Sequence, residues 1–446
     1  SWLCVSVADS LQYDHAGDDV EDLATQHGTQ SDMPNNEEIS SDPPSEKRRT
    51  SAKKEEGSIN NPKTESVEVS TWDNADEELL PVMPLKDPAL EKVTAREARV
   101  SAAQVAAEIE KSNSVEKPIY CFPPINLLHP AKRNNADGTG MTVLSEEAKK
   151  AIAEYHIGGV ILFAENLDTK EQTQQLTYDL QAAAHMPLFI GIDEEGGLVS
   201  RLKKSNIEHE TFPDAAEMED VSWAGTSIGS SLGELGINVD FAPVADVNTN
   251  PDNPVIGTRA FSSDPQAAAS KVAEFITAIQ KMGVSACAKH FPGHGDTAMD
   301  SHLGETFVEH DMERLRSVEF VPFEQAITAG TDFIMAGHIK TPNATTDGMS
   351  ATLSSEMLGI LRNDLGFNGI IITDAMNMGA IVDAYGSGES AVMAVQAGVD
   401  MVLMPANLSE AANALTAAIQ DGTISEERVN EALWHVLSLK YDKGIL

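Results

Sequence analysis

The sequence is poor in aromatic residues, cysteine and positive charge, and each shortage argues against a class of protein. Aromatic residues make up 5% of the 446 positions, and the chain has three cysteines. Three cysteines cannot build a disulfide framework, and no run of about eighteen apolar residues predicts a membrane span. The 31 lysines and arginines are outnumbered by 70 aspartates and glutamates, a net charge of −39 that argues against a nucleic-acid backbone as a partner.

The first part of the chain, residues 1–90, is predicted to be a disordered acidic tail or linker. It is rich in Asp, Glu, Ser, Asn, Pro and Thr, so it cannot bury enough apolar area to offset the entropy lost on ordering. Cys4 leaves two interpretations open, an ordinary thiol or a lipid-modified cysteine that tethers the N-terminus to a membrane. A spacer of this kind favours a secreted or cell-envelope protein, and a cytoplasmic location stays open.

Residues 91–446 are predicted to form a single domain of alternating strands and helices. A capping-box pattern, Thr94-Ala-Arg-Glu97, predicts a helix that continues to Lys111. The expected strands are mostly continuous Val, Ile, Leu and Phe runs, as buried parallel strands require. These strands are Pro118–Phe122, Gly159–Phe163, Leu188–Ile192, Asn238–Pro243, Val284–Ala288, Phe333–Ala336, Ile370–Thr373 and Met401–Leu403.

Helical stretches separate the expected strands. Examples are Lys170–Ala184, Ala267–Lys281, Met312–Ala329, Ser355–Leu365 and Ser409–Ile419. Strand–helix alternation repeated in this way favours an α/β protein with a (β/α)8 TIM-type barrel. A doubly wound open sheet would show the same alternation, so periodicity leaves both architectures open.

Titratable side chains cluster directly after the expected strand Val284–Ala288. The cluster consists of Lys289, His290, His294, Asp296, Asp300 and His302. Burying so many polar groups in a core is costly, so we expect them to line a cleft. A solvated surface loop is the alternative. His294 leaves two roles open, contact with a ligand or support of the loop.

Other polar residues follow other expected strands, and the carboxyl ends of strands are where barrel enzymes assemble their active sites. Asp374 ends an all-apolar strand, where a carboxylate must be used or paired. A helix N-cap is its alternative role. Asp193, Arg201 and Arg259 offer a carboxylate and two guanidinium forks to a polar ligand, with surface ion pairs as the alternative. Asp246 is expected to be structural, pairing with backbone or with Arg259.

Two motifs resemble those of a known family. The run Lys-His-Phe-Pro-Gly-His-Gly-x4-Asp-Ser-His, residues 289–302, resembles the signature of the NagZ-type β-N-acetylglucosaminidases of glycoside hydrolase family 3. The run Thr373-Asp374-x3-Met378-Gly is similar to that family's nucleophile motif. The resemblance implies a barrel in which Asp374 is the nucleophile, and in which His302 is the acid/base of a dyad with Asp300.

The resemblance also implies which residues hold the sugar. They are Asp193, Arg201, Arg259, Lys289 and His290. The segment from Asp193 to Arg201 departs from the family's Asp-Gln-Glu-Gly-Gly-Arg-Val-x-Arg at Leu198, so an arginine contact there is not expected. The segment around Arg259 is similar to the family's Ile-Gly-x-Arg-Ser-Phe and departs from it at Ala260, which removes a hydroxyl contact.

These similarities imply a retaining, exo-acting β-hexosaminidase that removes terminal non-reducing β-linked N-acetylglucosamine through a covalent glycosyl-Asp374 intermediate. Peptidoglycan fragments are the substrate that the resemblance favours. Three alternatives stay open: a β-N-acetylglucosaminide phosphorylase, a β-glucosidase on the same scaffold, and an inactive glycan-binding protein. No cofactor is expected. No metal is expected either, because His294 and His302 lack the Cys or carboxylate pattern of a metal site.

Overall fold

The computed structural model describes residues 3–6, 144–302 and 304–446. All of these residues belong to one compact unit of the chain. The predicted acidic tail beyond residue 6, the predicted helix from Thr94 to Lys111 and the predicted strand Pro118–Phe122 lie outside the described residues.

The described residues contain an eight-stranded sheet in which every neighbouring pair is parallel. Its strands are β1 (Leu3–Ser6), β2 (Gly159–Leu162), β3 (Phe189–Ile192), β6 (Val239–Asp240), β7 (Ser285–Phe291), β9 (Phe333–Ala336), β11 (Ile370–Thr373) and β12 (Val402–Leu403). The spatial order is β11-β9-β7-β6-β3-β2-β1-β12, so successive strands along the chain are neighbours, as parallel βα units require.

The two end strands of this order also meet. Ile372 of β11 forms a parallel bridge with Met401, the residue before β12. The Met401 N–H donates to Ile371 O and the Thr373 N–H donates to Met401 O, both at 3.1 Å. The parallel sheet predicted from the apolar runs is therefore present, and its first and last members are linked by backbone hydrogen bonds.

Seven of the eight predicted strand positions contain a strand of this sheet. The first strand corrects the sequence interpretation, because Leu3–Ser6 were assigned to the acidic tail and instead pair with β2 and β12. The run Leu-Cys-Val-Ser is only four residues long. Its apolar character is hidden when composition is averaged over the polar residues that follow it.

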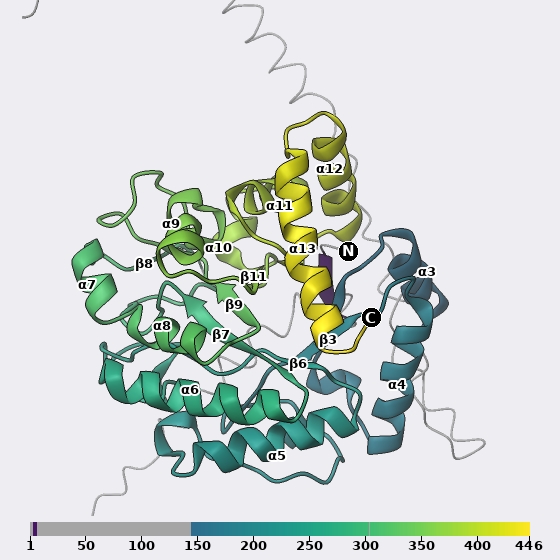
Figure 1. Ribbon diagram of the computed structural model, residues 1–446, viewed down its shortest axis with the longest axis horizontal. Helices are drawn as coiled ribbons and strands as arrows, with labels where there is room; N and C mark the ends of the chain where they lie inside the picture. Colours follow the sequence, from purple (N-terminus) through teal and green to yellow (C-terminus); the bar gives the residue numbers. More distant parts are fainter. Residues whose placement is uncertain (1–2, 7–143, 303) are drawn as a thin grey trace, which may run out of the picture. The chain divides into compact units, whose positions relative to one another are not determined.

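Helices surround the sheet (Figure 1). They are α3 (Glu146–Glu154), α4 (Lys170–Ala183), α5 (Val221–Glu234), α6 (Pro265–Lys281), α7 (Met312–Ser317), α8 (Val321–Thr328), α9 (Ser355–Gly359), α10 (Gly379–Val382), α11 (Ser387–Ala397), α12 (Leu408–Gln420) and α13 (Glu426–Asp442). Short additional strands are β4 (Glu194–Gly196), β5 (Val199–Ser200), β8 (Thr306–Phe307) and β10 (Ile339–Lys340). None of the described helices combines the length and the apolar composition that crossing a bilayer would require.

One predicted helix is divided in two. The stretch Met312–Ala329 contains α7 and α8 rather than a single helix. Pro322 lies in the first turn of α8. A proline has no N–H to donate to the carbonyl of the preceding turn, so a continuous helix would lose a hydrogen bond there, whereas a helix start tolerates it.

Alternate residues of β3 and β11 face two different cores. Ile370 and Ile372 of β11 belong to a buried cluster built mainly of strand residues, whereas Ile371 belongs to the cluster that includes the helices. Phe189 and Ile190 of β3 divide in the same way. Both faces of the sheet are thus apolar, which explains why its strands are continuous rather than alternating hydrophobic runs.

The amino end of the sheet is closed by α13. Lys440 of this helix is fully buried. Its ammonium donates to the carbonyls of Gly158 and Pro187, at 3.0 and 2.5 Å, just before β2 and β3. The polar site lies at the opposite, carboxyl end.

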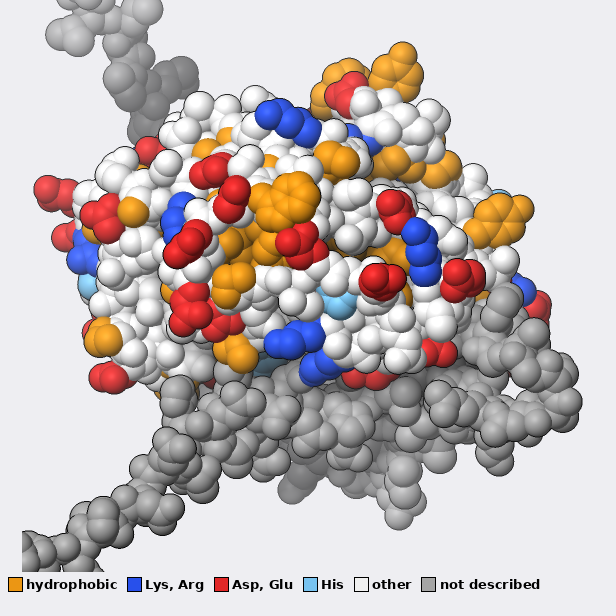
Figure 2. All heavy atoms as spheres, turned by 90° about the horizontal axis from the view of Figure 1, so that it is seen from below, with side chains coloured by type: hydrophobic (Ala, Val, Ile, Leu, Met, Phe, Trp, Pro, Cys, Tyr) orange, Lys and Arg blue, Asp and Glu red, His pale blue; other side chains and the backbone are white. Residues whose placement is uncertain are grey.

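The face seen from below in Figure 2 has acidic side chains spread around an apolar area.

Candidate active site

Several of the predicted site residues lie at the carboxyl ends of parallel strands or directly follow them. Asp193 follows β3, Lys289 and His290 belong to β7, and Asp374 follows β11. Because these strands are parallel, their carboxyl ends lie at one edge of the sheet, where barrel enzymes assemble active sites. The fold therefore brings together side chains that are up to 181 positions apart, from Asp193 to Asp374.

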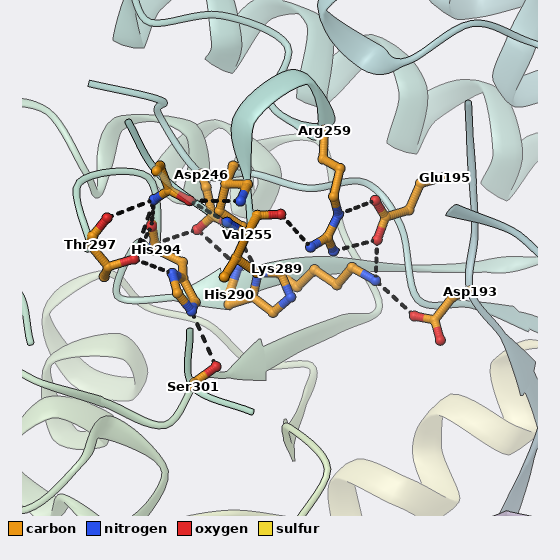
Figure 3. Close-up of polar contacts among 12 residues, drawn as sticks. Asp193, Glu195, Asp246, Val255, Arg259, Lys289, His290, His294, Thr297 and Ser301 are labelled. Carbon is orange, nitrogen blue, oxygen red and sulfur yellow. Dashed lines mark hydrogen bonds and ion pairs between the residues drawn. The ribbon is translucent and has the colours of Figure 1, made fainter. Parts of the chain in front are cut away.

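A buried ion-pair cluster forms one half of the site (Figure 3). The Lys289 ammonium lies 2.8 Å from Asp193 Oδ1 and 2.6 Å from Glu195 Oε1. Arg259 donates from Nε and Nη2 to the two oxygens of Glu195, both at 2.8 Å. Arg201 Nη2 contacts the other oxygen of Asp193 at 3.3 Å. Four of the five residues predicted to hold a sugar are thus brought together, and Glu195 links two of them.

Opposite charge decides the protonation of this cluster. Burial alone would raise the pKa of Glu195, but Arg259 and Lys289 lower that pKa far below its ordinary value. Burial alone would lower the pKa of Lys289, but Asp193 and Glu195 raise it well above its ordinary value. The carboxylates of Asp193 and Glu195 are therefore ionised and the Lys289 ammonium is protonated. Buried charges are stable when they are paired in this way.

The turn after β3 is shaped by Glu194, whose role the sequence reasoning missed together with that of Glu195. Glu194 Oε2 accepts from the backbone N–H groups of Arg201 and Leu202, at 2.8 and 3.0 Å. Gly197 has a φ of +56°, and an added Cβ there would lie 1.8 Å from a carboxylate oxygen of Asp214. The available signal was the Glu-Glu-Gly-Gly run itself, two carboxylates directly after a strand.

A second group of contacts surrounds Asp246, which is fully buried. Its Oδ2 accepts from the His290 ring nitrogen Nδ1 at 2.8 Å. Its Oδ1 accepts from the backbone N–H groups of His290 and His294, at 3.2 and 2.7 Å. The sequence predicted a structural partner for backbone or for Arg259, and the contacts are with backbone and with His290.

Asp300 and His302 form a pair within an irregular loop. His302 Nδ1 donates to Asp300 Oδ1 at 2.8 Å, and the His302 backbone N–H donates to the same oxygen at 2.9 Å. Burial would lower the pKa of His302, but the bond to Asp300 and its charge raise that pKa above the ordinary value. The side chain of His302 is 47% exposed and that of Asp300 is 9% exposed. The imidazole of His302 is therefore exposed to solvent, while the Asp300 carboxylate that holds it is buried.

The pKa of Asp374 is lowered by three imidazoles and a backbone hydrogen bond. Burial alone would raise its pKa, but His290, His338 and His302 lower it below the ordinary value, helped by a 2.8 Å bond from the Ala375 backbone N–H. Asp374 is not the cap of the next helix, because the N-cap of α10 is Met378. The alternative role as a helix cap is therefore wrong.

The loop that carries Asp300 and His302 contacts the segment beyond Asp374. The backbone N–H groups of Gly379 and Ala380 donate to the carbonyls of His302 and Ser301, both at 3.3 Å. His302 and Asp374 thus belong to the same edge of the molecule. The described residues contain no group of three or more His, Cys, Asp or Glu that could hold a metal ion.

Comparison with known proteins gives the family. The N-terminal domain of glycosyl hydrolase family 3 matches residues 132–439. Beta-hexosaminidase A of Pseudoalteromonas piscicida is 35% identical over an alignment 334 residues long, which covers 67% of this chain and 56% of the relative. A beta-N-acetylglucosaminidase/beta-glucosidase of Cellulomonas fimi is 33% identical over an alignment 302 residues long, which covers 65% of this chain and 53% of that protein.

Solved structures agree with the sequence matches. A glycoside hydrolase family 3 beta-N-acetylglucosaminidase from Paenibacillus sp. str. FPU-7 is 41% identical, with a TM-score of 0.65 over 68% of this chain and 59% of that one. The chain spans little more than half the length of these relatives. The chain belongs to glycosyl hydrolase family 3.

Proposed function

We propose that this protein is a retaining β-N-acetylglucosaminidase that releases terminal non-reducing β-linked N-acetylglucosamine. The observation that carries the proposal is the meeting of two groups at one edge of the sheet. One is Asp374, a half-buried carboxylate whose pKa is lowered by three imidazoles. The other is the Asp300–His302 pair, whose loop contacts the segment after Asp374. Retaining glycoside hydrolysis needs a nucleophile and a proton donor on opposite sides of one bond.

The roles of the two groups follow from their charges. The ionised carboxylate of Asp374 attacks the anomeric carbon, and the bond from that carbon to the leaving oxygen breaks. His302 Nδ1 is occupied by Asp300, so Nε2–H gives its proton to the leaving oxygen. In the second step Nε2 takes a proton from water while the water oxygen displaces Asp374 from the anomeric carbon.

The buried ion-pair cluster and the neighbouring His290 form the proposed sugar subsite, in which Asp193, Arg201, Arg259, Lys289 and His290 contact the sugar. The carboxylate can accept hydrogen bonds from sugar hydroxyls, and the cationic groups can donate hydrogen bonds to neighbouring ones. The donors are held before substrate arrives, because Lys289 and Arg259 both contact Glu195. Pre-organised donors lose less entropy on binding than mobile ones do.

We also propose the remaining features that the sequence implied. The eight-stranded sheet closes as a (β/α)8-type barrel, which the bridge between Ile372 and Met401 supports. Residues 91–446 form the catalytic domain, to which β1 adds one strand. Peptidoglycan fragments are the substrate, and the chain acts outside the cytoplasm on an N-terminal spacer. The first of the relatives named above is a beta-hexosaminidase, which agrees with the acetamido sugar.

Two related activities would use the same residues. A phosphorylase would place phosphate where water attacks, and a neutral imidazole at His302 would not repel it. The Cellulomonas fimi relative carries beta-glucosidase in its name, so a plain glucoside is the other candidate substrate. Comparing 4-nitrophenyl N-acetylglucosaminide with the glucoside, each with and without phosphate, and identifying the sugar product separates the three activities.

The variant Asp374→Ala tests the nucleophile. We expect turnover of 4-nitrophenyl N-acetylglucosaminide to fall by roughly 10⁴-fold or more, because catalytic groups that act as a unit fail together. Asp383→Ala is the matched control, since Asp383 is an exposed carboxylate at the end of the nearby helix α10. Unchanged turnover by Asp374→Ala would refute both the nucleophile and the covalent intermediate. An inactive wild-type protein that still binds N-acetylglucosamine would favour the glycan-binding alternative.

A further inference from the structure

We propose that His294 and Ser301 are positioning residues that hold the Asp300–His302 pair in its working orientation. The device is a hydrogen bond between two uncharged side chains, from Ser301 Oγ to His294 Nε2, at 3.2 Å. The inference rests on the proposed function, because it gives these two residues a part in the same reaction. Figure 3 shows His294 pointing toward Ser301, away from the ion-pair cluster.

The base of the loop is fixed independently of this bond. Asp296 Oδ2 contacts His310 Nε2 at 2.6 Å, and Asp296 Oδ1 accepts from Thr249 Oγ1 at 2.7 Å. Asn253 Nδ2 donates to the carbonyls of His294 and Thr297, at 2.8 and 3.2 Å. Fixing the base shortens the segment that must be ordered, which lowers the entropic cost of holding its tip.

The far end of the loop is also fixed. Strand β8 pairs with β10, at Thr306 opposite Ile339 and Phe307 opposite Lys340. The tip between Asp296 and Thr306 carries both Asp300 and His302. Contacts made by the tip therefore decide where the imidazole points.

The direction of the bond follows from the neighbours of His294. Thr297 Oγ1 donates its proton to the His294 carbonyl at 2.9 Å, so it accepts from His294 Nδ1 at 2.6 Å. Burial lowers the pKa of His294 to about 4, so the ring is neutral at ordinary pH. A neutral ring that donates from Nδ1 must accept at Nε2, and Ser301 Oγ–H supplies the donor.

Ser301 lies between the two members of the pair and is 1% exposed, whereas the side chain of His302 is 47% exposed. The backbone N–H groups of Gly379 and Ala380 also donate to the carbonyls of His302 and Ser301, both at 3.3 Å. Removing the Ser301 hydroxyl leaves these backbone bonds and the ion-pair cluster in place. The expected effect is therefore on proton transfer by His302 and not on binding of the sugar.

The test compares kcat/KM of Ser301→Ala for two aryl N-acetylglucosaminides. A 4-methoxyphenyl leaving group needs protonation, and a 2,4-dinitrophenyl leaving group does not. We expect kcat/KM to fall about three- to tenfold for the first, the worth of one neutral hydrogen bond, and less than about twofold for the second. Binding of free N-acetylglucosamine should stay as in the wild type. A merely structural loss would lower both rates together.

Three further variants keep the result decisive. Ser390→Ala is the matched control, because Ser390 is also buried and its hydroxyl donates to Ser387 O at 3.3 Å on α11. Ser301→Thr keeps the hydroxyl and should restore the wild-type ratio of the two rates. Thr297→Val removes the acceptor that fixes the ring of His294 and should show the same dependence on the leaving group, so it replaces Ser301→Ala if that variant does not fold.

The outcomes separate the two levels of the proposal. If the wild type is active and Asp374→Ala is not, but Ser301→Ala or its replacement changes both rates equally or not at all, the positioning role is wrong and the proposed function stands. If the wild type releases neither aryl group, or if Asp374→Ala keeps its activity, the proposed function itself is wrong.

Discussion

Replacing Glu195 by glutamine removes one negative charge from a cluster in which two cations depend on it. The carboxylate is 5% exposed and lies 2.6 Å from Lys289 and 2.8 Å from two nitrogens of Arg259. A glutamine of the same shape keeps one acceptor oxygen and turns an N–H donor toward a cation. Leaving a buried charge without its partner costs about 3–5 kcal/mol. We expect the free energy of unfolding to fall by about that amount, and KM to rise as Lys289 and Arg259 lose their shared anchor.

Urea unfolding followed by circular dichroism measures the loss, and initial rates with 4-nitrophenyl N-acetylglucosaminide measure KM. Asp364→Asn is the matched control, because Asp364 and Arg316 form an ion pair whose side chains are 49% and 41% exposed. Exposed pairs contribute about 0.2–1 kcal/mol, so this control should change little. A loss for Glu195→Gln no larger than that of the control would refute the view that Glu195 holds the cluster together.

Two further predictions concern protons. Asp300→Asn removes the charge that raises the pKa of His302, so the alkaline limb of kcat/KM, where His302 loses its proton, should move to lower pH; an unmoved limb contradicts the role of Asp300. Asp240 is buried, its Oδ1 accepts from the Glu194 N–H at 2.9 Å, and burial raises its pKa well above the ordinary value. The folded chain therefore holds a proton that the unfolded chain loses, and stability falls as pH rises above the ordinary pKa of Asp. Asp240→Asn should stabilise more at about pH 8 than at about pH 5 in thermal unfolding; an equal gain at both contradicts this.

Much of the sheet could be predicted because its strands are apolar on both faces. The strand Ile370–Thr373 was predicted with the same bounds that the structure has, because an Ile-Ile-Ile run between polar segments is expected to be buried. Strand β1 could not be predicted, because pairing with β2 and β12 selects Leu3–Ser6 rather than any local pattern. A four-residue strand carries too little periodicity to be recognised alone.

The candidate site was predictable as a set of residues but not as a set of contacts. The positions of Lys289 and Arg259 follow from motifs. Both cations contact Glu195, and Arg259 is 64 positions from Glu195 in the chain. Separation in the sequence does not show that two residues touch in space. The sequence favoured a ligand as the partner of each cation and left a surface ion pair as the alternative for Arg259. The structure has the cations against carboxylates of the protein, which is what burial of charge requires.

The use of an imidazole as the proposed proton donor is consistent with the charge of Asp374. A carboxylic acid in the place of His302 would become an anion after giving up its proton, and a second anion nearby would raise the pKa of Asp374. An imidazolium becomes neutral instead, and while protonated it lowers that pKa. Asp300 can keep its own charge although its side chain is only 9% exposed, because two N–H donors of His302 face it and lower its pKa. The proton therefore moves at His302 without adding a negative charge beside Asp374.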